Sequence, residues 1–206
     1  GGIYSRWSKM LIINTIIRNN KAYRGGGIYH YGYGQNDAGL KLHNVILYGN
    51  KSLDRGGAIF NEGGILECIG CTIENNSAWG GGAVFLGGGS TKTRIINSIL
   101  VNNSPNQVHL EGDNHNLSIS YSNLSNGRKG IFNGNFHELN WGLGNIDVDS
   151  IFKTKADYKY ELDEESKNSQ PFWAMLKLNT KRVSLVVIDG QHRLSALKSL
   201  ACSEDV

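Results

Sequence analysis

Apolar residues in this chain come in short runs, and each run is bounded by glycine or asparagine. One phrase recurs at residues 25–29, 56–60 and 81–85: two glycines, Gly or Ala, an aliphatic residue, then an aromatic one. Shorter copies stand at residues 1–4, 106–109 and 129–132. The aliphatic position falls at residues 3, 28, 59, 84, 108 and 131, with spacings of 25, 31, 25, 24 and 23. This pattern predicts an internal repeat of about 25 residues.

A second phrase, which ends in asparagine, precedes each later copy of the first. It occupies residues 16–20, 46–50, 73–76, 100–103 and 123–126. Short β-branched runs between Gly and Asn favour strands over helices. Gly and Asn tolerate positive φ at the turns, and Asn can bond to the neighbouring coil. We therefore predict an all-β right-handed parallel β-helix solenoid over residues 1–152, since leucine-rich repeats need regular leucines and propeller blades need about 40 residues.

The coils resemble the right-handed β-helix repeats of pectin-lyase-like proteins and of polymorphic outer-membrane-type surface proteins. Residues 75–82, Asn-Asn-Ser-Ala-Trp-Gly-Gly-Gly, fit the Asn/Gly phrase of those repeats closely. Residues 119–124 and 141–149 resemble the last coil of such secreted bacterial proteins. The resemblance implies an extracellular or cell-surface location. It leaves the function open, because the same scaffold carries lyases, hydrolases, adhesins and passive stalks.

Composition marks a boundary near residue 150. Of the 27 glycines, 26 lie in residues 1–150, and asparagine falls from 21 before residue 150 to 2 after it. The net charge of +3 is spread over both parts, which argues against nonspecific nucleic-acid binding. No apolar run approaches 18 residues, so no transmembrane segment is expected.

The predicted solenoid offers few candidates for chemistry. Acidic residues such as Asp54 and Glu62 do not recur at equivalent positions of neighbouring coils, so no catalytic carboxylate pair, metal site or cofactor is predicted. The aromatic residues after the aliphatic position, Tyr29, Phe60 and Phe85, would form a stripe suited to stacking on glycan rings if they face outward. Alternatively, one residue of each adjacent pair points inward and the other lines a turn.

After residue 152 the pattern changes. Residues 153–170 are polar and predict a linker, residues 183–188 predict a buried strand, and residues 192–200 predict an amphipathic helix. Residues 187–197 resemble the signature of DGQHR-domain proteins, a group linked to DNA phosphorothioation and similar to ParB and sulfiredoxin folds. The resemblance implies a partial α/β domain at 171–206 and a phosphate, nucleotide or DNA site formed by Asp189, Gly190, Gln191, His192 and Arg193. An ordinary strand–turn–helix is the alternative.

Three functions follow from these observations. The first is a non-catalytic, secreted or surface β-helix scaffold for adhesion or glycan contact, joined to the partial DGQHR segment. The second is a polysaccharide lyase or hydrolase of the pectin-lyase-like fold. The third is a nucleotide- or DNA-binding protein acting through Asp189 to Arg193, which would favour the cytoplasm. Because the first coil begins within a repeat, we also expect the solenoid to be truncated at its N-terminus and the whole chain to be a fragment.

Overall fold

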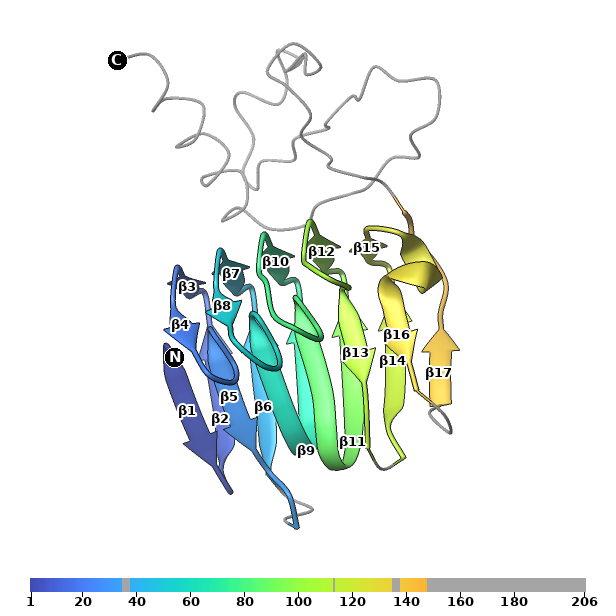
Figure 1. Cartoon of the computed structure of the whole chain (residues 1–206). Coiled ribbons are helices and arrows are strands. Elements are labelled where there is room, and N and C mark those ends of the chain that lie inside the picture. The colour runs from blue at the N-terminus through green and yellow to red at the C-terminus, as the bar shows by residue number, and fades with distance from the viewer. Residues whose placement is uncertain (35–37, 113, 135–137, 148–206) are drawn as a thin grey trace, which may run out of the picture. The chain divides into compact units, whose positions relative to one another are not determined.

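The computed structural model describes residues 1–34, 38–112, 114–134 and 138–147 of the chain. They form a parallel β-solenoid of about five turns, with the strands stacked coil upon coil (Figure 1). The predicted β-helix repeat is confirmed over this part. The right hand of the coil stays a prediction. So do the boundary at residue 152, the linker at 153–170 and the α/β segment at 171–206, which all lie outside the described residues.

The largest sheet has ten strands, all paired in parallel. Its first row is β1 (Ile3–Arg6), β5 (Ile28–Tyr31), β9 (Ile59–Ile69), β11 (Val84–Ile96), β13 (Val108–Leu110) and β16 (Ile131–Asn133). Its second row is β2 (Lys9–Ile13), β6 (Gly39–His43), the ends of β9 and β11, β14 (Asn116–Ser120) and β17 (Glu138–Trp141). The long strands β9 and β11 therefore join the two rows.

Two smaller sheets complete each coil. The five-stranded sheet contains β3 (Ile16–Arg18), β7 (Ile46–Tyr48), β10 (Thr72–Glu74), β12 (Ile99–Val101) and β15 (Asn123–Leu124). A two-stranded sheet pairs β4 (Lys21–Ala22) with β8 (Lys51–Ser52), and a 3-10 helix, η1, spans Gly127–Gly130. No helix in the described ranges is long and apolar enough to cross a membrane.

The register of the strands matches the spacing of the sequence repeat. The aliphatic markers pair from coil to coil as one column: Ile3, Ile28, Ile59, Val84, Val108 and Ile131. A second column on the five-stranded sheet contains Ile17, Leu47, Ile73, Leu100 and Leu124. The two columns meet in the core, which also contains the fully buried side chains of Cys68 and Cys71.

The one long interval in the repeat, from residue 28 to residue 59, is absorbed at bends. Two residues separate β1 from β2, whereas seven separate β5 from β6. Five residues lie between β4 and β5, and six lie between β8 and β9. These two bends account for the whole difference, because the other intervals of the two coils are equal in length. Insertions at a bend leave strand pairing intact, so the core columns stay continuous.

Asparagine side chains link the coils in the turn that follows the five-stranded sheet. Asn50 Nδ2 donates to Asn76 Oδ1 at 3.0 Å and to the Ile17 carbonyl at 2.9 Å. Asn76 Nδ2 donates in the same way to Asn103 Oδ1 and to the Leu47 carbonyl, both at 2.9 Å. The backbone N–H of Asn50 also donates to Asn76 Oδ1, at 2.8 Å. The resulting asparagine ladder consists of Asn20, Asn50, Asn76 and Asn103.

In each turn of the asparagine ladder, one residue adopts the left-handed backbone conformation and the next residue supplies the ladder side chain. The residue before each ladder asparagine has a left-handed backbone, with φ of 56° at Asn19, 61° at Gly49, 56° at Asn75 and 55° at Asn102. Strand pairing of β15 with β12 places Asn126, with φ of 66°, in register with Asn102. The fifth copy of the phrase therefore supplies a left-handed turn residue and no ladder residue. The ladder ends at Asn103, whose Nδ2 donates to Gln107 Oε1 at 2.7 Å.

Replacing Asn76 by alanine should lower the free energy of unfolding by about 2–4 kcal/mol, because buried groups left unpaired cost about 1–3 kcal/mol each. The groups affected include the Asn50 amide and the Leu47 carbonyl. Urea unfolding followed by circular dichroism measures the loss. Asn75→Gly is the matched control, since Asn75 is exposed and its positive φ suits glycine. Equal stability losses in the two variants would contradict a special role of the ladder.

Candidate functional site

A stack of aromatic rings runs along the outside of the first row of strands. Its members follow the aliphatic markers directly, so strand alternation turns them away from the core. Neighbouring ring centroids lie 4.3–5.4 Å apart across the six strands of this row. This aromatic stack consists of Tyr4, Tyr29, Phe60, Phe85, His109 and Phe132. The sequence analysis predicted its recurrence, and the structure shows that the rings point outward.

The middle of the aromatic stack is covered although it faces away from the core. Phe60 is 1% exposed and Phe85 is fully buried, whereas the terminal ring of Tyr4 is 61% exposed. The guanidinium carbon of Arg24 lies 5.8 Å from the Phe60 centroid, and that of Arg55 lies 5.0 Å from the Phe85 centroid. Phe60 and Phe85 therefore present no free ring face to a glycan. Among the three predicted stacking residues, only Tyr29 keeps partial exposure.

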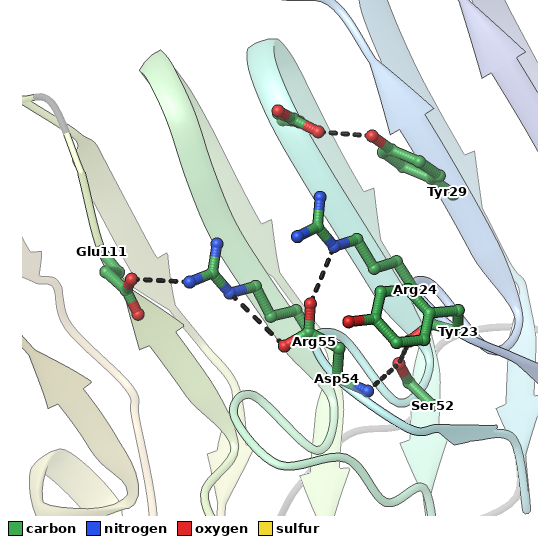
Figure 2. Close-up of polar contacts among 8 residues, drawn as sticks. Tyr23, Arg24, Tyr29, Ser52, Asp54, Arg55 and Glu111 are labelled. Carbon is green, nitrogen blue, oxygen red and sulfur yellow. Dashed lines mark hydrogen bonds and ion pairs between the residues drawn. The ribbon is translucent and has the colours of Figure 1, made fainter.

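The two arginines belong to an arginine–carboxylate cluster that spans four coils, namely Arg24, Asp54, Arg55 and Glu111. Arg24 Nε donates to Asp54 Oδ2 at 2.8 Å, and this bond raises the pKa of Arg24. Arg55 Nη2 donates to Glu111 Oε1 at 2.8 Å, and its Nε lies 3.8 Å from Asp54 Oδ1 (Figure 2). Asp54 is further fixed by its backbone N–H, which donates to Ser52 Oγ at 3.2 Å. The charges of the cluster are thus largely compensated within it.

Two more polar contacts join the aromatic stack to acidic residues. The Tyr29 hydroxyl donates to Glu62, and burial together with this carboxylate raises the pKa of Tyr29. His109 lies between Phe85 and Phe132 in the stack, and its Nε2 is 3.4 Å from Glu111 Oε2. Burial lowers the pKa of His109, and the Glu111 carboxylate offsets only part of that effect. Each carboxylate beside the stack therefore has a neutral or cationic partner.

The strand register confirms that acidic residues do not line up between coils at the two positions singled out in the sequence. Glu62 pairs with Tyr31 on one side and Gly87 on the other. The Asp54 backbone N–H donates to the Tyr23 carbonyl, and its own carbonyl accepts from Trp79 N–H, both at 2.9 Å. Over the residues that the structure describes, no group of three His, Cys, Asp or Glu side chains could hold a metal ion.

Two exposed aromatic residues flank the cluster, and the sequence analysis did not single them out. Tyr23 and Trp79 are each 67% exposed, and they occupy the turn positions on either side of Asp54, one coil away in each direction. Tyr23 lies beside Arg24 and Asp54 in the close-up (Figure 2). The sequence signal that could have found Tyr23 and Trp79 is their position just before a Gly phrase, where Asp54 is the equivalent residue of the coil between them. The predicted anion-site residues 189–193 lie outside the described part of the chain.

Comparison with known proteins adds one finding. A family model of the Chlamydia polymorphic membrane protein repeat matches residues 44–62. The matched segment begins two residues before β7 and ends within β9, and it includes the Gly56–Phe60 copy of the repeat. Searches of curated proteins and of solved structures gave no significant match. The chain is thus similar to that repeat over part of one coil, which agrees with the solenoid.

Replacing His109 by phenylalanine should flatten the acid side of the stability profile. Because the folded pKa is lowered, the folded state favours neutral His109, and stability falls as pH drops from about 7 to about 5, past the usual histidine pKa of about 6.5. His109→Phe keeps an aromatic ring in the stack and removes the contribution of His109 to the pH dependence of stability. A residual slope remains from His30, because burial lowers its pKa as well. Urea midpoints measured across this pH range test the prediction.

His43→Gln serves as the control, because His43 lies on β6 away from the aromatic stack and its side chain is 36% exposed. His109→Phe should change the slope of stability against pH more than this variant does. An undiminished slope in His109→Phe would show that His109 does not carry it.

Proposed function

We propose that this chain is a non-catalytic, surface-associated β-solenoid that contacts glycan chains through Tyr23 and Trp79. The observation that carries the proposal is the pair of exposed aromatic residues beside Asp54, in the middle of the arginine–carboxylate cluster. Aromatic faces pack against the apolar faces of sugar rings, and nearby charged groups bond to hydroxyls. Tyr23 and Trp79 take the role first assigned to Phe60 and Phe85.

The spacing of the two aromatics suits an extended ligand that lies along the solenoid. Tyr23 and Trp79 stand two coils apart, which is about 10 Å at the usual strand spacing of about 4.8 Å. Asp54 and the partly exposed guanidinium groups of Arg24 and Arg55 lie between or beside them. A chain of sugar rings placed there would meet apolar faces at both ends and hydrogen-bonding groups in the middle.

The charge arrangement supports a scaffold in preference to an enzyme. Glycoside cleavage needs two carboxylates about 5–10 Å apart that can exchange protons. Here Asp54 bonds to Arg24, Glu111 bonds to Arg55, and Glu62 accepts from Tyr29. These contacts use the three carboxylates in ion pairs and in one hydrogen bond beside the aromatic stack.

The likeness of residues 44–62 to a repeat of a polymorphic membrane protein supports the surface location. A stacked solenoid is well suited to that setting, because its backbone is hydrogen-bonded from coil to coil along its length. Adhesion would follow if the glycan belongs to another cell.

Tyr23→Ala and Trp79→Ala should each weaken binding to the best glycan on an array by about 10-fold or more. The reason is that an aromatic side chain stacked on a ring, as measured for nucleic-acid bases, contributes about 1–3 kcal/mol. Tyr48→Ala is the control, because Tyr48 is 42% exposed but lies on the five-stranded sheet. Isothermal titration with the selected oligosaccharide gives the affinities.

Absence of any selective glycan binding by the unmodified chain would overturn glycan contact and leave a structural role. Release of unsaturated or reducing ends from pectin or alginate would overturn the non-catalytic role and favour a polysaccharide lyase or hydrolase. Equal losses in all three variants would indicate unfolding, which circular dichroism detects independently.

A second function rests on the DGQHR resemblance. Asp189-Gly190-Gln191-His192-Arg193 follows a predicted strand and opens a predicted helix, which is the context in which backbone N–H groups and an arginine bind phosphate. We propose nucleotide or DNA binding at this segment, independent of the solenoid.

Arg193→Ala should reduce binding of a fluorescent nucleotide or a short DNA duplex by the full chain at least about 10-fold, because a charge-assisted bond contributes about 1.5–3 kcal/mol. Lys198→Ala removes the same charge five residues further along the predicted helix and should change binding little. Fluorescence anisotropy measures both. Unchanged affinity in Arg193→Ala would refute a phosphate site at this motif.

A further inference from the structure

Inside the first coils, one core column is polar where the following coils are apolar. Ser5, His30 and Asn61 pair in register on β1, β5 and β9, two residues after the aliphatic markers and facing the same interior. The next two positions of the column are Leu86 and Leu110. His30 and Asn61 are both fully buried. Polar side chains therefore occupy a place that the repeat itself fills with leucine.

The two ends of this polar column are bonded differently. Ser5 Oγ lies 2.7 Å from Ser8 Oγ and 3.1 Å from His30 Nδ1, so the outer end is paired. In the described part of the chain, His30 Nε2 and both polar atoms of the Asn61 amide have no hydrogen-bond partner among protein atoms. Three unpaired polar atoms thus lie on two residues that are direct neighbours across paired strands.

Leaving a buried polar group unpaired costs more than a typical hydrogen bond contributes. Buried polar atoms in folded proteins are almost always satisfied by protein or by ordered water. Internal waters occur about once per 27 residues and commonly make about three hydrogen bonds. An amide with a free donor and a free acceptor beside a free imidazole nitrogen offers that number of partners.

We propose that His30 and Asn61 form an internal water-binding site in the solenoid core. Water there accepts from Asn61 Nδ2 or donates to Asn61 Oδ1, and it bonds to His30 Nε2 according to the tautomer that Ser5 selects through Nδ1. The polar part of the column ends at Asn61, because the next residue, Leu86, has no side-chain group that can bond to water. It is independent of glycan or nucleotide binding.

Water-selective nuclear Overhauser spectroscopy on the ¹⁵N-labelled chain tests the site directly. The Asn61 side-chain amide should show cross-peaks to long-lived water. The Asn76 amide is the internal control, because it is equally buried and its Nδ2 donates to the Leu47 and Glu74 carbonyls and to Asn103 Oδ1. Asn61 signals no stronger than those of Asn76 would overturn the proposal.

Asn61→Leu gives a second, energetic test, since leucine is the residue at this position in the next two coils. If water satisfies the Asn61 amide, the urea midpoint of Asn61→Leu stays unchanged or falls. The variant loses the hydrogen bonds between the amide and the water, and His30 Nε2 loses the water that linked it to residue 61. A clearly higher midpoint would mean that the column is dry and would overturn the proposal. The spectroscopic test uses the unmodified chain, so it holds even if the variant folds poorly.

Discussion

The structure depends on one constraint: the backbone and the ladder asparagines of each coil form their hydrogen bonds with the coil above or below it. The asparagine ladder shows this most clearly, because Asn76 bonds to Asn50 on one side and to Asn103 on the other. Strand pairing obeys the same rule along the solenoid. Any shift of register by one residue would leave amides and carbonyls unpaired in the interior. This is why extra residues appear at bends and leave the strands unchanged.

The same stacking shapes the outer surface. Equivalent residues lie about 4.8 Å apart on neighbouring coils, so recurrent aromatics are forced into contact and recurrent charges would repel. The aromatic residues accordingly form a continuous stack of rings. Beside the stack, charged residues pair with residues of opposite sign, and Arg24 pairs with Asp54 while Arg55 pairs with Glu111. On the second row of strands, Glu67 lies between Lys41 and Arg94 in the same manner. Charge on this surface is mainly a requirement of stacking.

The functional surface was only partly visible in the sequence. The recurrence of Phe60 and Phe85 was plain, but their burial was not, because the covering guanidinium groups come from turns one coil away. Tyr23 and Trp79 escaped notice because they share a row with Asp54 and so do not repeat as a type. The polar pair His30 and Asn61 escaped for the same reason, since leucine follows at the next coils. Repeat analysis finds what recurs, whereas these sites consist of departures from the repeat.

The repeat pattern was sufficient to predict the solenoid, its period and the columns of equivalent residues, such as Ile3 with Ile28. It could do so because each coil repeats the same local requirements: β-branched strands, left-handed turn residues and an asparagine that bonds to the next coil. The three-dimensional arrangement was needed to see which side chains are exposed, which charges compensate each other and which buried atoms lack partners. These properties depend on distances between different coils, and a linear pattern records equivalence between coils without recording what covers each residue.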